Sequence, residues 1–284
     1  MLEAFQSYIK SHDLFRPVDR LLVAASGGID SMVLLHLLEI VGQPLEVAHM
    51  NFQLRGDASN EDEAFVQSYC ESRSLLCHCR RVETGNYARE KGLSTQIAAR
   101  ALRYEWFEEL LRSTQCVYLL TAHHADDSVE TALFNFTKGT GIAGLSGIKP
   151  KIAQVRRPLL FAQKKDIVDY AQTHGVHWRE DETNVETHYA RNKLRHEVLP
   201  VLKEINPSIV AHFDDTSQRL SGVQQLLLET ARDLKEKKLE TIGDGLVLHT
   251  DWLHGDARSL VLLSEILSDF SFSFRQSRQV FEAL

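Results

Sequence analysis

The sequence predicts an α/β fold, in which a doubly wound parallel sheet is followed by a small helical second domain. In the first half of the chain, short apolar runs typical of buried strands alternate with segments whose apolar residues recur at helical spacing. This alternation requires crossover connections, which place helices on both faces of a parallel sheet. At 284 residues the chain is long enough for two domains, expected over 1–204 and 205–284.

The elements of the larger domain follow in chain order. Strands are expected at 20–25, 45–50, 76–82, 116–122 and 154–160. Helices are expected at 30–41, 59–74, 94–112, 127–137 and 163–174. Sheets of this class bind ligands at the carboxyl ends of their strands, so the turns that follow the strands should carry the chemistry.

The smaller domain follows a break at 204–207. Its expected helices lie at 217–238, 257–269 and 275–284. The last of them has no capping Gly or Pro and ends in the apolar pattern QVFEAL, which indicates a missing C-terminal domain.

The composition, with 43% apolar and 25% charged residues, is typical of a globular protein. No apolar run approaches the ~20 residues that span a bilayer, and the N-terminal helix pattern contains acids and no cleavage site. The four cysteines form no Cys-x-x-Cys pair, and Cys77 and Cys79 are expected to be buried free thiols on one face of a strand. We therefore predict a cytoplasmic protein with no membrane partner.

Charge is distributed unevenly along the chain. The net charge of −7 argues against a simple nucleic-acid binder. Residues 149–203, however, carry 11 basic and 7 acidic side chains and lie between two acidic segments. This basic strip predicts local docking of a polyanion, and a solvated surface is the alternative.

The turn after the first expected strand, Ser-Gly-Gly-Ile-Asp-Ser at 26–31, is the most informative motif. Adjacent glycines let the backbone approach a ligand closely, and the following helix start presents N–H groups and a positive dipole end. The turn therefore predicts an anion site suited to phosphate, with an ordinary strand-to-helix turn as the alternative. Its spacing is not that of a Walker A loop.

A second glycine-rich segment, Gly-x-Gly-x-x-Gly at 139–144, follows an expected helix. A dinucleotide fingerprint needs a strand directly before it, so that interpretation is excluded. We expect these glycines to cap the helix and to shape a loop over the active cleft.

Polar motifs also follow the second and fourth strands, His-Met-Asn-Phe-Gln-Leu-Arg at 49–55 and His-His-Ala-Asp-Asp at 123–127. In the helix between them, Arg100 and Arg103 share one face. The histidine–aspartate cluster suggests zinc, but four well-spaced Cys or His ligands are absent. A hard cation held mostly by substrate phosphates fits better, which predicts Mg²⁺.

Ser-Gly-Gly-x-Asp-Ser resembles the pyrophosphate-binding loop of N-type ATP pyrophosphatases, which split ATP between the α and β phosphates. Further motifs narrow the resemblance: His-x-Asn-x-x-Leu-Arg, Ala-Arg-x-x-Arg-Tyr, His-His-x-Asp-Asp-x-x-Glu-Thr, Arg-Arg-Pro at 156–158, Trp-Arg-Glu-Asp-Glu-Thr-Asn at 178–184 and Arg-Asn-x-x-Arg at 191–195. Over about 18–203, the chain resembles the tRNA(Ile)-lysidine synthetase family. It departs from the common pattern at Phe52 and Ser128, where His and Gln are frequent.

The resemblance implies a tRNA-modifying ligase. Such enzymes adenylate the wobble cytidine of a CAU-anticodon tRNA(Ile) with ATP, releasing pyrophosphate. Free L-lysine then attacks C2 of the base to give lysidine, and AMP leaves. The expected cofactors and partners are ATP, Mg²⁺, tRNA(Ile) and lysine, and a homodimer is a further expectation.

The resemblance also implies roles for individual residues, taken here as expectations. ATP or pyrophosphate binding falls to Ser26, Gly27, Gly28, Ile29, Asp30 and Ser31. The catalytic candidates are Asp30, also the Mg²⁺ ligand, with Arg100, Arg103, His124 and Asp127. Lysine binding falls to Asp127 and Glu130, and tRNA binding to Arg156, Arg157, Arg191, Asn192 and Arg195. Phe52 or Tyr104 is expected to stack on the unstacked cytidine.

Three alternatives remain open. A tRNA thiolase of the same group usually carries Cys-x-x-Cys pairs, which this chain lacks, and a glutamine-dependent synthetase needs an extra amidase domain. A non-catalytic RNA-binding module is disfavoured by the intact 26–31 turn and by Asp126 and Asp127.

Overall fold

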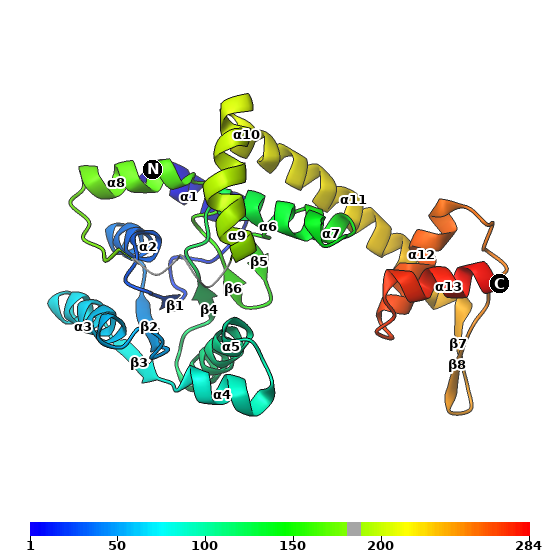
Figure 1. Ribbon diagram of the computed structural model, residues 1–284, viewed down its shortest axis with the longest axis horizontal. Coiled ribbons are helices and arrows are strands. Elements are labelled where there is room, and N and C mark those ends of the chain that lie inside the picture. The colour runs from blue at the N-terminus through cyan, green and yellow to red at the C-terminus, as the bar shows by residue number, and fades with distance from the viewer. Residues whose placement is uncertain (181–188) are drawn as a thin grey trace. The chain divides into compact units, whose positions relative to one another are not determined.

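The computed structural model describes residues 1–180 and 189–284, so the acidic end of the 178–184 motif lies outside the described residues. A six-stranded sheet in the order β3-β2-β1-β4-β6-β5 lies within the larger of its two units (Figure 1). Its strands are β1 (Leu21–Ala24), β2 (Leu45–Asn51), β3 (Cys77–Arg81), β4 (Tyr118–Leu120), β5 (Lys151–Ile152) and β6 (Val155–Arg156). All neighbouring pairs are parallel except β5 with β6, which confirms the predicted doubly wound fold class.

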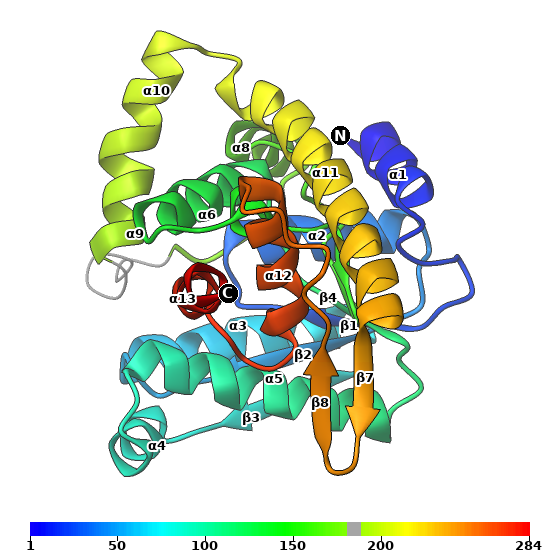
Figure 2. The same cartoon turned by 90° about the vertical axis from the view of Figure 1, so that its right-hand side faces the viewer.

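The helices around this sheet are α1 (Leu2–Ser11), α2 (Ile29–Ile40), α3 (Asp57–Ser72), α4 (Thr84–Lys91), α5 (Thr95–Ser113), α6 (Ala125–Thr137) and α8 (Lys164–Thr173). They are followed by α9 (Tyr189–Lys193), the π-helical turn η1 (Leu194–Val198), α10 (Leu199–Ile205) and the start of α11 (Ile209–Lys238). Figure 2 shows α2 and α8 on one side of the sheet and α5 on the other.

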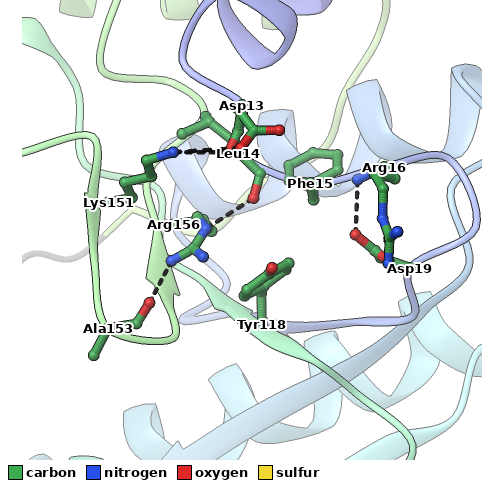
Figure 3. Close-up of a pocket in the computed structure, with 9 residues that line it drawn as sticks. All are labelled: Asp13, Leu14, Phe15, Arg16, Asp19, Tyr118, Lys151, Ala153 and Arg156. Atoms are coloured by element: carbon green, nitrogen blue, oxygen red, sulfur yellow. Dashed lines mark hydrogen bonds and ion pairs between the residues drawn. The ribbon is translucent and has the colours of Figure 1, made fainter.

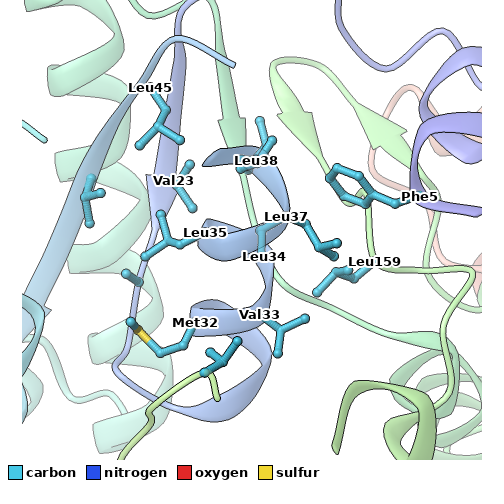
Figure 4. Packing of buried hydrophobic residues seen from close by; sticks show 14 of the residues in the cluster. Phe5, Val23, Met32, Val33, Leu34, Leu35, Leu37, Leu38, Leu45 and Leu159 are labelled. Carbon is cyan, nitrogen blue, oxygen red and sulfur yellow. The ribbon is translucent and has the colours of Figure 1, made fainter. Parts of the chain in front are cut away.

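Strand alternation explains this two-sided cover, because successive side chains point to opposite faces. Leu21 and Val23 of β1 pack with α1, α2, α3 and α8 in the larger apolar cluster (Figure 4). Leu22, between them, packs on the other face against Trp106 and Phe107 of α5. Since β1 is buried on both faces, its sequence is a continuous apolar run.

The chain divides into two compact units, residues 1–139 with 147–214 and residues 140–146 with 215–284. The second unit contains α7 (Ile142–Leu145), most of α11, the hairpin β7 (Leu239–Ile242) and β8 (Gly245–Leu248), α12 (Ala257–Ser268) and α13 (Phe274–Ala283). A small core of Ala231, Leu262 and Ile266 holds α11 and α12 together. The predicted domain boundary at residue 204 stays a prediction.

The expected elements differ from the structure in several places, and the helical run from α9 to α10 is among the elements that were not predicted. The strand expected at 154–160 contains only β6, because Pro158 cannot donate to a ladder. Helix α11 begins at Ile209, eight residues before the expected start. Helix α4 and the β7–β8 hairpin were not predicted; a Gly-Asp-Gly turn at 243–245 is the signal that marks the hairpin.

Two smaller predictions concern caps and thiols. Gly139 follows α6 with a φ of 72° and donates its N–H to Phe136 O, so the predicted glycine cap is confirmed. That its loop covers the active cleft stays a prediction. Cys77 and Cys79 share a strand face as expected, with their Sγ atoms 3.6 Å apart, but both are half-buried instead of buried.

Candidate active site

The 26–31 turn joins β1 to α2 at the carboxyl end of β1, where the strand order reverses between β1 and β4. The hydroxyl groups of its two serines hydrogen-bond to the backbone of the same turn. Ser31 Oγ donates to Gly28 O (2.8 Å) and accepts from Ser26 N (3.2 Å), while Gly28 N donates to Ser26 Oγ (3.2 Å). The first N–H groups of α2 have no partner within the helix, so they form an anion cradle.

Gly27 fixes the shape of this turn. Its φ of 88° lies in the region that disfavours side chains, and an added Cβ would meet Phe65 and Val66 of α3 at 3.5 Å. Its carbonyl accepts from Arg179 N at 3.0 Å, and the Arg179 side chain binds Asp62 on α3 (2.7 Å). The turn is therefore held against α3 by contacts that no local sequence pattern reveals.

A cavity of about 240 Å³ opens beside the turn. Ser26, Asp30, Ser31, Phe52, Arg100, Arg103, Tyr104 and His123 are among the residues that line it. Arg100 stacks on Tyr104 with its guanidinium carbon 4.7 Å from the ring centre, and Arg103 stacks on Phe52 at 4.9 Å. The structure thus brings both predicted catalytic arginines to the predicted phosphate turn, with an aromatic ring beneath each.

His123 lies in this cavity, whereas His124 is not among the residues lining it. The His123 ring shares a hydrogen bond with Thr121 Oγ1 (2.9 Å), and burial lowers its pKa to about 4. It is therefore neutral at pH 7, and it supplies a polar group without charge.

The predicted lysine anchors face an arginine of this chain. Arg195 donates from Nε to Glu130 Oε1 (2.7 Å) and from Nη2 to both Glu130 Oε2 and Asp127 Oδ1 (2.8 Å each). Glu130 is 2% exposed, so its carboxylate is largely desolvated. Burial raises the pKa of Asp127, but the two neighbouring histidines, the His124 N–H and Arg195 lower it overall.

Two lysines that the sequence analysis missed complete this charged cluster. Lys164, which begins α8, donates from Nζ to Asp30 Oδ1 (2.5 Å) and from its backbone N to Asp126 Oδ2 (2.8 Å). Lys203 of α10 donates to Asp126 Oδ1 (2.6 Å). Both lysines are far from their partners in sequence. The sequence therefore offers no sign of these ion pairs beyond the position of each lysine near the end of a helix.

His124 lies at the centre of this cluster and is 4% exposed. Its Nε2 is 3.5 Å from Asp127 Oδ2 and 4.0 Å from Asp30 Oδ1. Its Nδ1 is buried and has no hydrogen-bond partner among the described residues. A buried unpaired ring nitrogen beside carboxylates is a group that can accept or relay a proton.

The geometry removes Arg156 from the predicted tRNA contacts. It is 8% exposed, and its guanidinium donates to Leu14 O (2.8 Å) and Ala153 O (2.6 Å) while stacking on Tyr118. These contacts lie in a second cavity of about 540 Å³, next to Asp19 before β1 and to the start of β4 (Figure 3). That cavity is at the amino ends of β1 and β4, away from the anion cradle.

The three other predicted tRNA arginines also have internal partners. Arg157 is 7% exposed and donates to Lys149 O (2.7 Å), Arg191 donates to Thr131 Oγ1 (2.5 Å), and Arg195 binds the acids described above. Asn192 is half-buried. Exposed cations of the basic strip are lysines, including Lys149, Lys151 and Lys193.

No group of three or more His, Cys, Asp or Glu side chains in the described part of the chain is arranged to hold a metal ion. Asp30 offers a single carboxylate at the cradle, a donor set that suits Mg²⁺ only when phosphate oxygens supply the remaining ligands. Among the same residues, no helix is both long enough and apolar enough to cross a bilayer.

Comparison with known proteins fits this geometry. Residues 1–202 match the PP-loop domain family. The chain is 39% identical over 277 residues to the tRNA(Ile)-lysidine synthase of Bacteroides thetaiotaomicron, covering 98% of this chain and 64% of that protein. It is 37% identical over 243 residues to the Bacillus subtilis tRNA(Ile)-lysidine synthase, covering 83% and 52%. The chain thus spans less than two thirds of these relatives' length.

A solved structure shares the fold. The U34-tRNA thiolase NcsA from Methanococcus maripaludis superposes with a TM-score of 0.61 at 17% identity, covering 77% of each chain. At that identity the likeness concerns the arrangement of strands and helices alone.

Proposed function

The chain belongs to the PP-loop domain family, and we propose that it is the catalytic part of a tRNA(Ile)-lysidine synthase. The proposal rests mainly on three features that lie next to one another in the structure. An anion cradle, a cavity flanked by two arginines and a cluster of buried carboxylates meet at the carboxyl ends of β1 and β4. Two tRNA(Ile)-lysidine synthases with 37% and 39% identity over most of this chain support the same assignment.

The first step forms a bond between O2 of the wobble cytidine and the α-phosphorus of ATP, and the bond to pyrophosphate breaks. The cradle N–H groups at Gly28–Ser31 hold the departing pyrophosphate, because its charge grows as the bond breaks. Arg100 and Arg103, which line the cavity, stabilise the α-phosphate. Asp30 would hold Mg²⁺, which supplies positive charge to the phosphates when it is bound.

The second step forms a bond between the lysine side-chain nitrogen and C2 of the base, and the bond from C2 to the AMP oxygen breaks. The amine attacks only when neutral, and at pH 7 an amine with a pKa of about 10.4 is neutral about once in ~2,500 molecules, equivalent to about 4.6 kcal/mol. Asp127 and Glu130 bind the ammonium form. The proton released on attack passes to this cluster, where the buried His124 ring, with its Nε2 3.5 Å from Asp127 Oδ2, is the proposed acceptor.

The tRNA must reach this site with its wobble base unstacked. Phe52 and Tyr104 line the cavity and offer aromatic faces to that base. Exposed lysines of the basic strip, Lys149, Lys151 and Lys193, contact phosphates. All cysteines are free thiols, which suits a reducing compartment, so we place the reaction in the cytoplasm.

The test uses the 284-residue chain with ATP, labelled lysine and a tRNA(Ile) transcript that carries CAU. We expect label in the tRNA, with AMP and pyrophosphate released in equal amounts. A tRNA(Met) transcript with the same anticodon measures selectivity, and an Asp30→Ala variant is the matched inactive control. Pyrophosphate release without label in the tRNA would reject the lysidine assignment and leave a general PP-loop ATPase.

A further inference from the structure

Arg195 binds three of the four carboxylate oxygens at the place proposed for the substrate amine. It bonds both oxygens of Glu130 and one of Asp127, and the remaining oxygen, Asp127 Oδ2, accepts from His124 N (3.1 Å). Each of the four carboxylate oxygens thus already accepts one hydrogen bond. An incoming ammonium that bridges both acids takes the position of the guanidinium, so Arg195 moves away when it binds.

The charges of the cluster explain why an arginine is present. Asp30, Asp126, Asp127 and Glu130 are four carboxylates, and their partners Lys164, Lys203 and Arg195 are three cations. Without Arg195 the half-buried Asp127 and the buried Glu130 would face each other with no cation between them, which disfavours the folded state. A substrate ammonium carries the same charge as a guanidinium, so exchange of one for the other preserves the balance.

The position of Arg195 permits such an exchange. Its side chain is 39% exposed, whereas those of Glu130 and Asp127 are 3% and 16% exposed, so the arginine is the solvent-facing member of the group. It lies on η1, a π-helical turn between α9 and α10. A π turn inserts one residue into a helix, and a return to α-helical winding would re-aim every side chain on it.

We propose that Arg195 is a built-in stand-in for the ammonium group of the substrate, bound to Asp127 and Glu130 until lysine replaces it. This inference rests on the proposed function for the identity of the amine. The buried ring of His124 lies beside the same site with its Nε2 3.5 Å from Asp127 Oδ2, which marks the place as more than a structural ion pair. Arg195 is thus a specificity-determining residue, because only a ligand with a cationic head can take over its bonds.

Lysine can bind only those molecules in which Arg195 has left Asp127 and Glu130. The apparent dissociation constant for lysine is therefore the intrinsic constant divided by the fraction of such molecules. If Arg195 vacates the two acids in about a tenth of molecules or fewer, its removal tightens lysine binding about tenfold or more. Arg195→Met keeps a stem of similar length and removes the guanidinium. Arg195→Lys keeps a cation that can occupy the acids, so it should bind lysine about as weakly as the unaltered chain.

The experiment measures L-lysine binding to the 284-residue chain by calorimetry, without ATP or tRNA, and norleucine, which lacks the ammonium, is the control ligand. Arg112→Met is the matched control, because it removes an arginine from an exposed pair with Glu108. We expect tighter lysine binding for Arg195→Met alone and no norleucine binding. If Arg195→Met folds poorly, added lysine should raise its melting temperature more than that of the unaltered chain.

Unchanged or weaker lysine binding by Arg195→Met would overturn the stand-in role, as would no detectable binding to either protein or equal tightening in Arg112→Met. Failure of the proposed function looks different. In that case the unaltered chain makes no lysidine, while Arg195→Met still gains affinity for the amine. Lysidine formation without that gain would leave the function intact and reject the stand-in.

Discussion

Replacing Asp127 by asparagine should separate the two chemical steps. Asp127 Oδ2 accepts from His124 N and so caps α6, while Oδ1 binds Arg195. An asparagine oxygen can still cap the helix, so the stability lost at the cap, about 1 kcal/mol for alanine, is mostly retained. What disappears is one negative charge at the place proposed for the lysine ammonium.

The magnitude follows from the bond that is lost. A hydrogen bond to a charged group contributes about 1.5–3 kcal/mol, so the KM for lysine should rise about tenfold to about 150-fold. Pyrophosphate release in the presence of tRNA, which reports adenylation, should change less than about threefold, because Asp127 is not among the residues that line the cavity beside the turn.

The assay compares the initial rates of pyrophosphate release and of labelled lysine incorporation over a lysine titration. Asp127→Ala, which loses both cap and charge, serves as a comparison and should also melt earlier. An equal loss of both rates in Asp127→Asn, with unchanged melting temperature, would refute a lysine-specific role for this carboxylate.

Three further outcomes are expected. Asp30→Ala should slow pyrophosphate release about a hundredfold, since it removes the carboxylate of the cradle, and an unaltered rate in a pyrophosphate assay would reject that role. Lys164→Met should slow pyrophosphate release, because it removes the side-chain bond to Asp30 at the cradle while the backbone bond to Asp126 remains; an unaltered release rate would contradict this role. Asp126→Asn should lower stability at pH 7 by about 1–2 kcal/mol, discounted because Lys203 is 37% exposed. Burial raises the pKa of Asp126, but Lys203, the Lys164 N–H and His124 lower it overall. Its contribution is therefore present above the unfolded pKa of about 3.9 and is lost as pH falls through the folded value, so denaturant unfolding of Asp126→Asn and the unaltered chain should converge in acid.

The sequence was sufficient where function depends on neighbours along the chain. The 26–31 turn follows an apolar strand and precedes a helix, so its cradle could be predicted from local pattern alone. Arg100 and Arg103 were placed together by helical spacing, and the cavity beside the turn contains both. The strands and crossover helices likewise follow from short-range periodicity, which is why the sheet was predicted with errors mainly in its shortest strands.

The sequence was not sufficient to predict the partner of a charged side chain when several acceptors lay elsewhere in the chain. Arg195 and Arg156 both look like phosphate ligands in a basic strip, but one binds acids 65 and 68 residues away and the other binds backbone carbonyls. Lys164 pairs with a carboxylate 134 residues earlier. Such choices depend on the packed fold, since a buried guanidinium takes whichever acceptors surround it.

The same long-range pairs suggest why the two proposed reactions share one site. Lys164 bonds Asp30 at the phosphate turn through Nζ and Asp126 at the start of α6 through its backbone N–H. Asp126 and Asp127 are adjacent, so a single helix start carries both the residue tied to the phosphate turn and the proposed lysine anchor. When pyrophosphate leaves the cradle, Asp30 and Lys164 lose a nearby negative charge, and the field at Asp127 changes with them. Release of pyrophosphate can thus alter the balance between Arg195 and an incoming ammonium without any movement of the sheet, which would order lysine binding after adenylation.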